Sequence, residues 1–564
     1  MIKLDSRTIR AFVDEELEFF VNARIQKIQQ PTRKELIFTV RNNGVAKKLY
    51  INVHPDFYHI CFMSPENESL RKIVQPKQPP MFCMLLRKHL EGAKITDIRA
   101  IQGERIVELI FENYSEFSKM DSLCLTVELM GKHSNVILYD YESKNILGCL
   151  HNVGEEKSRE RELAGGFLYT YPPRKNKKFI EQTSFDIFFD EIKKTNEKLH
   201  IYISENYFDF TRFIAETLCK STLLNYESSS IYTKENLFEL YQKMLNWVSN
   251  ENYLPCIFDK GQKFILFGND VECENFETVS GMIDTYFARH YSHYLFSNLV
   301  KKLESKLVKE ISRHKDLIKK ISVSDIDKLK TLNYKKYADL IMANLYHLKG
   351  NVLNKVELFD YETEKLVEIE LDETMSAVEN ANRYYRLYNK GKKAEEITEN
   401  LVAETVEKQR ILEDYLYSVY NVDEYDELEF IASELGFENV PVAKKKSDVS
   451  GLAVQKCLIN GFDVYVGKNN RQNDYLYSKI SSPDDLWFHA LNVSGSHVLL
   501  KVIKGKKVDN ETLYECAKLA KEYSNSRNSG KSLVIFTERR FIKRPPNTKS
   551  GYVTFKNETE VVVE

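Results

Sequence analysis

The chain has 564 residues, too many for one hydrophobic core, so three or four domains are expected. Its 43% hydrophobic and 29% charged residues are typical of a soluble globular protein with long surface helices. No stretch reaches the roughly eighteen apolar residues of a membrane span. Acidic residues interrupt the amphipathic helix predicted at residues 1–20, which excludes a signal peptide and favours a cytoplasmic location.

The nine cysteines are scattered, and no two have the CxxC spacing of a zinc site. Reduced, mostly buried thiols are therefore expected, and neither a metal nor a cofactor is predicted. The net charge is only −2, but residues 441–564 carry 21 Lys and Arg against 13 Asp and Glu, whereas residues 1–440 carry 60 against 70. A basic module on an acidic body suggests a polyanionic partner, although ordinary solvated surfaces also show such an excess.

Hydrophobic patterns over the first 140 residues predict an α+β domain with one helix inserted among antiparallel strands. The helix is expected at residues 79–95, and strands are expected at 35–43, 47–55 and 58–63 and within 94–112. Residues 122–140 are expected to add two more strands across a turn at Gly131. From about 165 to 275 the patterns are mainly those of short helices, at residues 185–194, 211–220 and 236–248. A small helical domain follows from these segments.

Two long amphipathic segments, residues 298–321 and 395–420, have apolar residues at roughly heptad spacing. The positions expected to face a partner helix are Val300, Leu303, Leu307, Leu317, Ile321, Ile397, Leu401, Leu412, Leu416 and Val419. An antiparallel coiled-coil arm with a small insert near residues 338–378 accounts for two matched helices. Two helices of a compact bundle remain an alternative.

Residues 443–448 form a basic linker into a last α+β domain. Its strands are expected at 463–468, 497–502, 532–538 and 551–556, around a helix at 512–528. The segment DDLWFHALNVSGSHVLLK, residues 484–501, places Ser496 between His489 and His497. An esterase would need a strained strand-to-helix turn and an oxyanion hole, whereas Ser496 leads straight into a strand, so catalysis is the weaker interpretation.

The same segment and its neighbours could also bind RNA, although composition alone slightly favours a structural role. Amide side chains in GKNNRQND, residues 467–474, can bond base edges, Trp487 and His489 can stack on bases, and the basic KRPP at 543–546 can neutralise phosphates. The alternative is that Trp487 and Phe488 are core residues and that NNRQND is a hairpin turn.

GKNNRQND, DDLWFHALNVSGSHVLL and FIKRPPNTKSGYVTF resemble the RNA-binding module of the NFACT family. ARIQKIQQP, PPMFCMLLRKHLEGAKI, GERIVELIF and VELMGKHSNVILYD resemble its N-terminal domain, and MANLYHLKG with VENANRYYRLYNKGKKA resembles its middle. The resemblance implies an α+β multidomain protein whose N-terminal domain is similar in fold to MutM-type DNA glycosylases. We place this domain at 1–170, a helix-hairpin-helix-like domain at 171–278, the coiled-coil arm at 279–440 and the RNA-binding module at 441–564.

Bacterial NFACT proteins, sometimes labelled fibronectin-binding proteins, are ribosome quality-control factors. The resemblance therefore implies binding to a large ribosomal subunit with a stalled peptidyl-tRNA, through contacts to tRNA and rRNA. It also implies recruitment of alanyl-tRNA for template-free alanine tailing, with a small RNA-binding helper protein as a further partner and no membrane. Peptide-bond formation is left to the ribosome, so the chain is expected not to be an enzyme. A fibronectin-binding surface adhesin is the alternative, against which the absent signal peptide and anchor argue.

The resemblance also assigns site residues. The family's Asp-Arg pair for tRNA engagement falls at Glu104 and Arg105, where glutamate replaces aspartate and is one methylene longer. Glu128 is a further expected tRNA-facing carboxylate, and Lys132, His133 and Asn135 follow on the adjoining turn. The expected RNA contacts of the module are Asn469, Asn470, Arg471, Gln472, Asn473, Asp474, Trp487, His489, Ser496, His497, Lys543 and Arg544.

Two departures limit what the resemblance implies. Residues 204–218, SENYFDFTRFIAETL, lack the glycine of a phosphate-binding hairpin turn, so the helical domain is expected to be a spacer. Glycosylase chemistry is not expected, because the chain begins Met1-Ile2, without an N-terminal proline nucleophile, and has no four-cysteine zinc finger.

Overall fold

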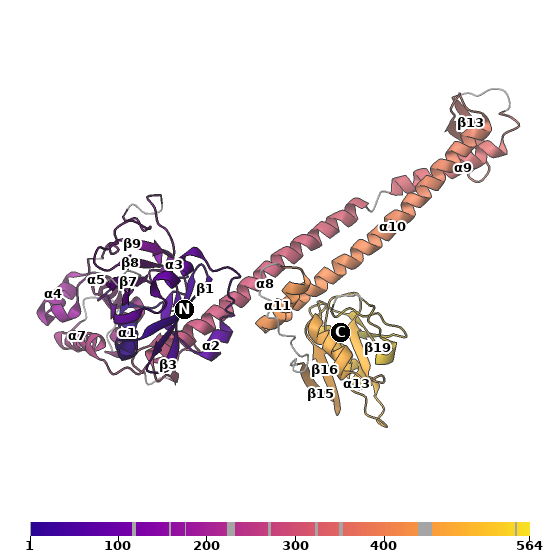
Figure 1. Ribbon diagram of the computed structural model, residues 1–564. Helices are drawn as coiled ribbons and strands as arrows, with labels where there is room; N and C mark the ends of the chain where they lie inside the picture. The colour runs from indigo at the N-terminus through magenta and orange to yellow at the C-terminus, as the bar shows by residue number, and fades with distance from the viewer. Residues whose placement is uncertain are drawn as a thin grey trace. The chain divides into compact units, whose positions relative to one another are not determined.

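The computed structural model describes residues 2–114, 120–156, 160–174, 176–222, 232–268, 272–321, 325–348, 354–437, 454–546 and 550–564. The chain divides into two compact units, residues 1–295 and 296–564. The first holds a large antiparallel sheet and a group of short helices, and the second holds long paired helices and a small α+β module (Figure 1). Among the described residues, no helix is both long and apolar enough to cross a membrane.

The sheet of the first unit has nine antiparallel strands in the order β4-β3-β2-β1-β5-β6-β7-β8-β9. The strands are β1 Arg24–Thr32, β2 Glu35–Asn42, β3 Val45–Asn52, β4 His59–Met63, β5 Lys94–Ala100, β6 Ile106–Tyr114, β7 Met120–Glu128, β8 Asn135–Asp140 and β9 Ile146–Cys149. Strands that are consecutive in the chain are neighbours in the sheet, except that β5 pairs with β1 and not with β4. Helices α2 Pro65–Leu70 and α3 Met81–Leu90 lie between β4 and β5 in the chain. The sequence patterns missed β1, whose alternation is broken by two register shifts.

Helix α1 Ser6–Phe20 packs on the sheet through an apolar face. It begins at residue 6 because the Asp5 carboxylate accepts a hydrogen bond from the Thr8 backbone nitrogen, 2.7 Å away, and so caps the helix. Phe12 and Phe20 are fully buried in the core that the helix shares with the sheet. The amphipathic pattern of the first 20 residues thus becomes a core helix.

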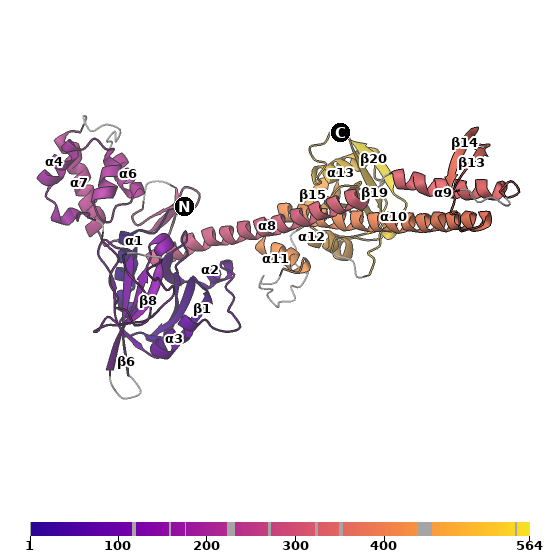
Figure 2. The same cartoon turned by 90° about the horizontal axis from the view of Figure 1, so that it is seen from above.

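Four short helices pack together beside this sheet (Figure 2). They are α4 Phe185–Lys194, α5 Leu199–Asn206, α6 Arg212–Ser221 and α7 Lys234–Ser249. The expectation of mainly helical structure up to residue 275 was incomplete, because three short strands follow α7. These are β10 Cys256–Phe258, β11 Lys263–Ile265 and β12 Cys273–Asn275, each too short to show an alternation in the sequence.

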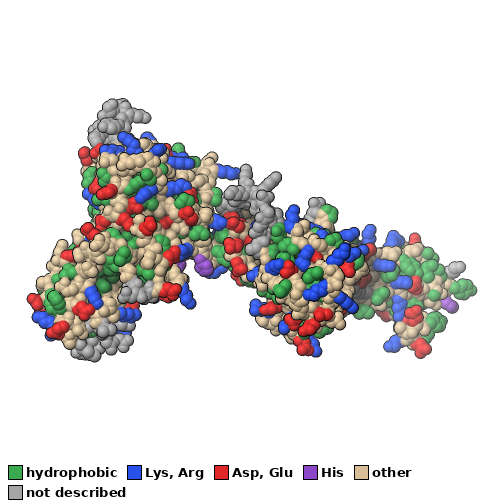
Figure 3. All heavy atoms as spheres, turned by 90° about the horizontal axis from the view of Figure 1, so that it is seen from below, with side chains coloured by type: hydrophobic (Ala, Val, Ile, Leu, Met, Phe, Trp, Pro, Cys, Tyr) green, Lys and Arg blue, Asp and Glu red, His purple; other side chains and the backbone are tan. Residues whose placement is uncertain are grey.

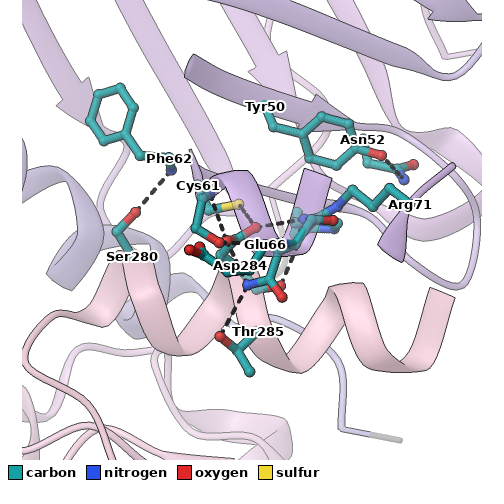
Figure 4. Close-up of polar contacts among 12 residues, drawn as sticks. Tyr50, Asn52, Cys61, Phe62, Glu66, Arg71, Ser280, Asp284 and Thr285 are labelled. Carbon is teal, nitrogen blue, oxygen red and sulfur yellow. Dashed lines mark hydrogen bonds and ion pairs between the residues drawn. The ribbon is translucent and has the colours of Figure 1, made fainter. Parts of the chain in front are cut away.

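Helix α8 Val279–Ile321 starts inside the first unit, where a buried ion pair fixes it (Figure 4). Arg71 Nη1 lies 2.7 Å from Asp284 Oδ1, and both side chains are almost completely buried. The other carboxylate oxygen accepts hydrogen bonds from Asn67 Nδ2 at 2.8 Å and from the Ser64 backbone nitrogen at 2.9 Å. The buried charges therefore have multiple partners, which a buried ion pair needs in order to persist.

In the second unit, α8 and the following α9 Asp325–Ala343 run antiparallel to α10 Ala377–Asn421 (Figures 1 and 2). Tyr420 donates a hydrogen bond to Glu304 near one end, and Tyr385 donates to Asp339 near the other. A hairpin of β13 Lys355–Asp360 and β14 Lys365–Glu370 packs against α9 and α10. We call these paired helices, from residue 296 to 421 with the hairpin, the arm.

Two apolar cores stabilise the arm. The predicted heptad positions are buried only within these cores. Leu303, Leu307 and Val419 are buried in the first core, and the second gathers residues of α9, the hairpin and the start of α10. Leu317, Ile397 and Leu401 lie between the two cores and are 41%, 60% and 42% exposed, so the prediction that they line a seam was wrong. A continuous seam requires packing partners along the whole length, and the two cores lie at the ends of the paired helices.

The module that ends the chain has a six-stranded antiparallel sheet in the order β15-β16-β18-β17-β19-β20, covered by α13 Asn510–Glu522. The strands are β15 Gln455–Ile459, β16 Phe462–Gly467, β17 Leu486–Ala490, β18 His497–Leu500, β19 Ser532–Glu538 and β20 Thr559–Val563. Residues 551–556 were expected to be a strand, but only Thr554 forms a bridge there, with Lys543. The NNRQND segment forms helix α12 Asn470–Tyr475, so the hairpin-turn alternative was wrong.

Candidate nucleic-acid interface

A cleft of about 500 Å³ in the first unit contains the predicted Glu104–Arg105 pair. One wall comes from the start of the chain and from the turn between β5 and β6, and the other comes from the helical group. The cleft is lined by Lys3, Leu4, Asp5, Ser6, Gly103, Glu104, Arg105, Met130, Pro172, Pro173, Lys177, Ser204, Glu205, Phe208, Asp209, Phe210, Thr211 and Arg212. The cleft thus combines apolar surface with carboxylates and cationic groups.

The turn that carries the pair depends on a glycine. Gly103 has a φ of +76°, and a Cβ atom at this position would lie 2.8 Å from the Phe208 ring. Arg105 donates a hydrogen bond from Nη1 to the Tyr58 hydroxyl, 2.7 Å away, and its guanidinium lies 5.4 Å from the centre of that ring. The arginine is therefore held in one orientation at the edge of the cleft.

Glu104 is positioned from the opposite side by Arg174. The Nε atom of Arg174 lies 3.8 Å from Glu104 Oε1, and the guanidinium also lies over the rings of Phe179 and Phe208. Both charged side chains are partly exposed, so this ion pair contributes orientation more than stability. The longer glutamate, which replaces the family's aspartate, thus has a cationic partner within reach.

The chemistry of the cleft suits a planar, polar group. Leu4, Met130 and Phe208 offer apolar contacts, while Glu104 can accept and Arg105 can donate hydrogen bonds. These are the contacts that an unstacked nucleobase takes from a protein. Burial raises the pKa of the Asp5 carboxyl in the same cleft, although its hydrogen bond from Thr8 acts in the opposite direction.

The helical group supplies one wall of this cleft. Lys177 and Arg212 contribute cationic side chains to the lining. Arg212 Nη2 lies 3.1 Å from Glu205, and Lys177 Nζ donates to the Ser204 carbonyl oxygen at 2.5 Å. The spacer expectation, which rested on a missing glycine in residues 204–218, stays a prediction.

Glu128 does not face a ligand in this structure. Its carboxylate is fully buried and accepts hydrogen bonds from Arg161 Nη1 at 2.8 Å and from the Tyr169 hydroxyl at 3.0 Å. These contacts hold the segment around residues 161–169 over the sheet. The tRNA contact predicted for Glu128 does not fit this placement, because its oxygens are already occupied by structural donors.

The turn after Glu128 divides into exposed and buried residues. Lys132 and His133 are exposed on a short 3₁₀ helix, Gly131–His133, and can reach a ligand. Asn135 is buried, because its Nδ2 donates to the His151 carbonyl oxygen at 2.8 Å and its Oδ1 accepts from the His151 backbone nitrogen at 2.9 Å. Direct RNA contact by Asn135 therefore does not fit the structure, whereas that of Lys132 and His133 stays a prediction.

The module's signature segment is largely turned inward, toward α10 and α11 Tyr425–Glu434. The Glu427 carboxylate accepts hydrogen bonds from Asn469 Nδ2 at 2.8 Å and from Gln472 Nε2 at 3.0 Å. Asn470 exchanges two hydrogen bonds of 3.2 Å with the Ser418 hydroxyl. All of these side chains are buried, so the predicted amide contacts to bases do not fit this arrangement.

The side chain of Asn473 is also buried and bonds to the protein, in this case within the module. Its Oδ1 accepts a hydrogen bond from the His497 backbone nitrogen at 3.1 Å, and the side chain is 4% exposed. It also lies close to Gly467, where a Cβ atom would lie 2.4 Å from Asn473 Oδ1. The amide therefore joins α12 to strands β16 and β18 and leaves no edge for a base.

Trp487, His489 and His497 form an aromatic cluster of their own. The rings of Trp487 and His489 stack with centres 5.6 Å apart and planes 2° apart, and His497 meets both edge-on. Burial lowers the pKa of His489 to about 4, with Arg410 contributing, and burial also lowers the pKa of His497 well below its usual range. Trp487 is 5% exposed, which confirms the core alternative rather than base stacking.

Ser496 is fully buried beside this cluster, which excludes the accessible nucleophile that an esterase needs. Lys543 and Arg544 are the exposed site residues of the module, and Arg471, Asp474 and His489 are partly exposed. Arg544 Nη1 lies 2.7 Å from Asp474 Oδ2, and Arg471 lies over the Phe430 ring. The space-filling view shows many Lys and Arg side chains on the face of the module that is turned toward the viewer (Figure 3).

Sequence reasoning missed the residues that hold the candidates in place: Arg174 for Glu104, Arg161 for Glu128 and Glu427 for the module. Arg174 directly follows the Pro172-Pro173 pair, which indicates a rigid extended segment but not its partner. The other two meet their partners only through the fold, and no local motif marks them.

Comparison with known proteins decides the family. Residues 5–449 match the family described as NFACT N-terminal and middle domains, and residues 458–557 match the NFACT protein RNA binding domain. The chain belongs to the NFACT family.

Relatives within the NFACT family span nearly the whole chain. The chain is 30% identical over 571 residues to the Rqc2 homolog RqcH of Streptococcus pneumoniae serotype 2, strain D39, covering 98% of this chain and 96% of the relative. It is 28% identical over 568 residues to the Rqc2 homolog RqcH of Bacillus subtilis strain 168, covering 97% and 95%. A solved N-terminal structure of the fibronectin/fibrinogen-binding protein from Streptococcus suis is 26% identical, covers 50% of this chain and 99% of that one, and has a TM-score of 0.41.

Proposed function

We propose that this NFACT protein is a ribosome quality-control factor acting in the cytoplasm. It binds large ribosomal subunits that carry a stalled peptidyl-tRNA, recruits alanyl-tRNA and promotes template-free C-terminal alanine tailing of the nascent chain. The observation that carries this proposal is the family membership along almost the full length, which includes an RNA-binding domain at residues 458–557. The fold of the first domain would then be shared with MutM-type glycosylases, and the helical group would be helix-hairpin-helix-like.

Within this proposal, the residues of the cleft and of the neighbouring turn have distinct roles. Glu104 and Arg105 supply an acceptor and a donor at the edge of an apolar cleft, which suits an unstacked base of the incoming tRNA. Lys132 and His133, on the exposed turn after β7, supply phosphate or sugar contacts. Arg174 and Tyr58 are positioning residues that hold the pair, so the one-methylene change at residue 104 is compatible with recruitment.

In this proposal the chain is not an enzyme, because the ribosome forms the peptide bond. The buried Ser496 supports this reading, since it offers no accessible nucleophile. The arm and the module supply subunit binding through rRNA and peptidyl-tRNA, and a small RNA-binding helper protein completes the assembly. Because phosphate contacts dominate such binding, its strength should fall steeply as salt rises.

The test is a pull-down of the tagged protein from its own cells at moderate salt, followed by sequencing of the RNA that copurifies. Large-subunit rRNA together with one enriched tRNA supports the proposal and identifies the amino acid. Ribosomal RNA without an enriched tRNA contradicts the recruitment step while leaving subunit binding intact. Absence of RNA contradicts the proposal as a whole.

The fibronectin-binding adhesin remains the competing proposal, and it rests on the labels that related proteins carry. It requires display on the cell surface, whereas the quality-control function requires access to ribosomes. Biotinylation of intact cells with a membrane-impermeant reagent separates the two. Labelling of this protein without labelling of a ribosomal protein would favour the adhesin.

A further inference from the structure

The two helices of the arm carry opposite charge along the stretch nearest the module. In α8, residues 296–321 have eight Lys and Arg against three Asp and Glu. In α10, residues 395–421 have two Lys and Arg against seven Asp and Glu. Facing helices of opposite charge attract one another, as the ion pair between Lys315 and Glu413 shows. The charge of α8 is therefore available to a further partner only where its cationic side chains point away from α10.

The basic side chains of α8 are exposed on its outer side. Leu303 and Leu307 point into the core of the arm, whereas Lys301, Lys302 and Lys309 are exposed. Among the described residues these three lysines have no ion-pair partner. The α8 carboxylates Glu304 and Glu310 are partly satisfied within the arm, by the Tyr420 hydroxyl and by Arg313 respectively. The free positive charge therefore lies on the solvent side of the helix.

This face is hollowed and includes hydroxyl groups. A shallow groove of about 680 Å³ is lined by Lys301, Glu304, Ser305, Val308, Lys309, Ser312, Arg313 and Asp316. Exposed ammonium groups with Ser305 and Ser312 hydroxyls between them are the donors that contact a phosphodiester backbone. From Lys301 to Arg313 the helix rises about 18 Å, enough for several consecutive phosphates.

The groove continues toward the RNA-binding module. A second hollow of about 410 Å³ shares Val308 and Ser312 with the first and is also lined by Asn525 of the module. The Tyr417 hydroxyl of α10 donates to the Tyr523 carbonyl oxygen, which fixes this part of the module beside the arm. The surface of α8 and the surface of the module are therefore continuous within this unit.

We propose that the outer face of α8, from Lys301 to Arg313, is a second RNA-binding surface that binds the phosphate backbone of RNA continuing from the module. The proposal rests on the RNA-binding function proposed above and names the surface of the arm that would carry its share of that function. Sequence is not read there, because Lys, Arg and Ser contacts to phosphate carry no base information. The acidic α10 faces away from RNA by like-charge repulsion.

The experiment compares two triple variants of the full chain. The test variant combines Lys301→Ala, Lys302→Ala and Lys309→Ala, and the matched control combines Lys390→Ala, Lys392→Ala and Lys393→Ala on α10. All six lysines are exposed and both variants remove three charges from the arm. The probe is a single-stranded RNA oligonucleotide about 30 nucleotides long, bound at a series of salt concentrations. Circular dichroism establishes that both variants keep their helices.

The slope of log Kobs against log salt is the deciding quantity. Removal of three phosphate contacts should reduce its magnitude by about 2 in the α8 variant, whereas the α10 control should keep the wild-type slope. Equal slopes in the wild type and the α8 variant would overturn the proposal while leaving RNA binding by the module intact. Equal reductions in both variants would also overturn it, because the effect would then come from net charge. A wild-type chain that binds no RNA would overturn this proposal together with the function on which it rests.

Discussion

Asn469 donates a hydrogen bond of 2.8 Å from Nδ2 to Oε2 of Glu427. An amide expected to read RNA thus joins the module to α11, and Gln472 makes a parallel contact of 3.0 Å to the other carboxylate oxygen. Both amides and the carboxylate are buried. The signature segment therefore sets the place of the module beside the arm, and RNA must meet the module on other residues.

Glu427→Ala should loosen this attachment and destabilise the second unit by about 1.5–3 kcal/mol, because two buried amides lose a charged acceptor. The free energy of unfolding in urea, followed by the fluorescence of Trp487 in a Trp247→Phe background, measures the loss. Faster hydrogen exchange of the α12 amides should accompany it. Glu424→Ala, an exposed residue just before the same helix, is the control. Equal stability of the two variants would mean that Glu427 does not hold the module.

Glu104→Ala with Arg105→Ala should abolish tRNA recruitment and spare binding to the large subunit, because both residues lie in the cleft of the first unit and not in the module. Sequencing of RNA bound to the double variant measures both activities in one experiment. Lys27→Ala with Arg33→Ala removes two charges from exposed positions of the same domain and serves as the control. Loss of rRNA along with tRNA in the cleft variant would show that its effect is not confined to recruitment.

Asp284→Ala should destabilise the first unit by about 3–5 kcal/mol, because it leaves the Arg71 guanidinium buried without its counter-charge. Urea unfolding followed by Trp247 fluorescence in a Trp487→Phe background gives the value. Arg289→Ala on the same helix breaks an exposed pair with Glu274 and should cost less than about 1 kcal/mol. A cost for Asp284→Ala as small as that of the control would contradict a structural role for the buried pair.

Acid should destabilise the second unit through His489 and His497. The pKa of His489 is lowered from 6.5 to about 4, and that of His497 is lowered well below 6.5. Between these values the unfolded chain binds protons that the folded chain does not, so stability is lost as pH falls from 6.5 toward 4. Urea unfolding at about pH 7 and about pH 4.5 should show this loss, and His489→Gln should reduce it. An unchanged pH dependence in that variant would contradict the prediction.

The carboxyl group of Asp414 should have the opposite effect to the histidines on the pH dependence of stability. Burial raises its pKa from 3.8 to about 6, with hydrogen bonding to Ser494 and the charge of Arg410 acting in the other direction. The folded carboxyl binds its proton near pH 6 and the unfolded one near pH 3.8, so this group adds stability as pH falls through that window. Asp414→Asn should therefore raise stability at pH 7 by up to about 3 kcal/mol and steepen the acid loss. Equal curves for the variant and the wild type would show that Asp414 is not perturbed.

Much of the fold could be predicted because its patterns are local. The alternation in residues 35–63 and 94–140 and the helical period of residues 298–321 and 395–420 each reflect one buried face. Strand β1 was not predicted because bulges shift the alternation of its buried and exposed residues. Strands β10 to β12 were not predicted because three residues are too few to show a hydrophobic period. Leu317, Ile397 and Leu401 fit the heptad pattern equally well, and only the positions of the two cores distinguish them from Leu303 and Leu307.

The candidate sites could be located from the sequence but not resolved residue by residue. Glu104 and Arg105 were named from the family resemblance, within a segment expected to be strands, and the structure shows that they lie in a turn that lines a cleft. For Glu128, Asn135 and Asn469 a polar side chain was taken as accessible, yet each is buried with a partner far along the chain. Such pairings depend on tertiary contacts, and composition cannot separate a buried amide from an exposed one.

The ion pair between Arg71 and Asp284 joins residues that the ribosome makes far apart in time. The two are separated by 213 positions, and all nine strands of the sheet and the four helices beside it are synthesised between or before them. Until α8 emerges from the exit tunnel, the Arg71 site lacks its counter-charge, and the surface that will bury it stays open to water. The core of the first unit is therefore completed by a helix from the middle of the chain. A nascent chain interrupted before residue 284 is left with the Arg71 guanidinium in its core without a counter-charge.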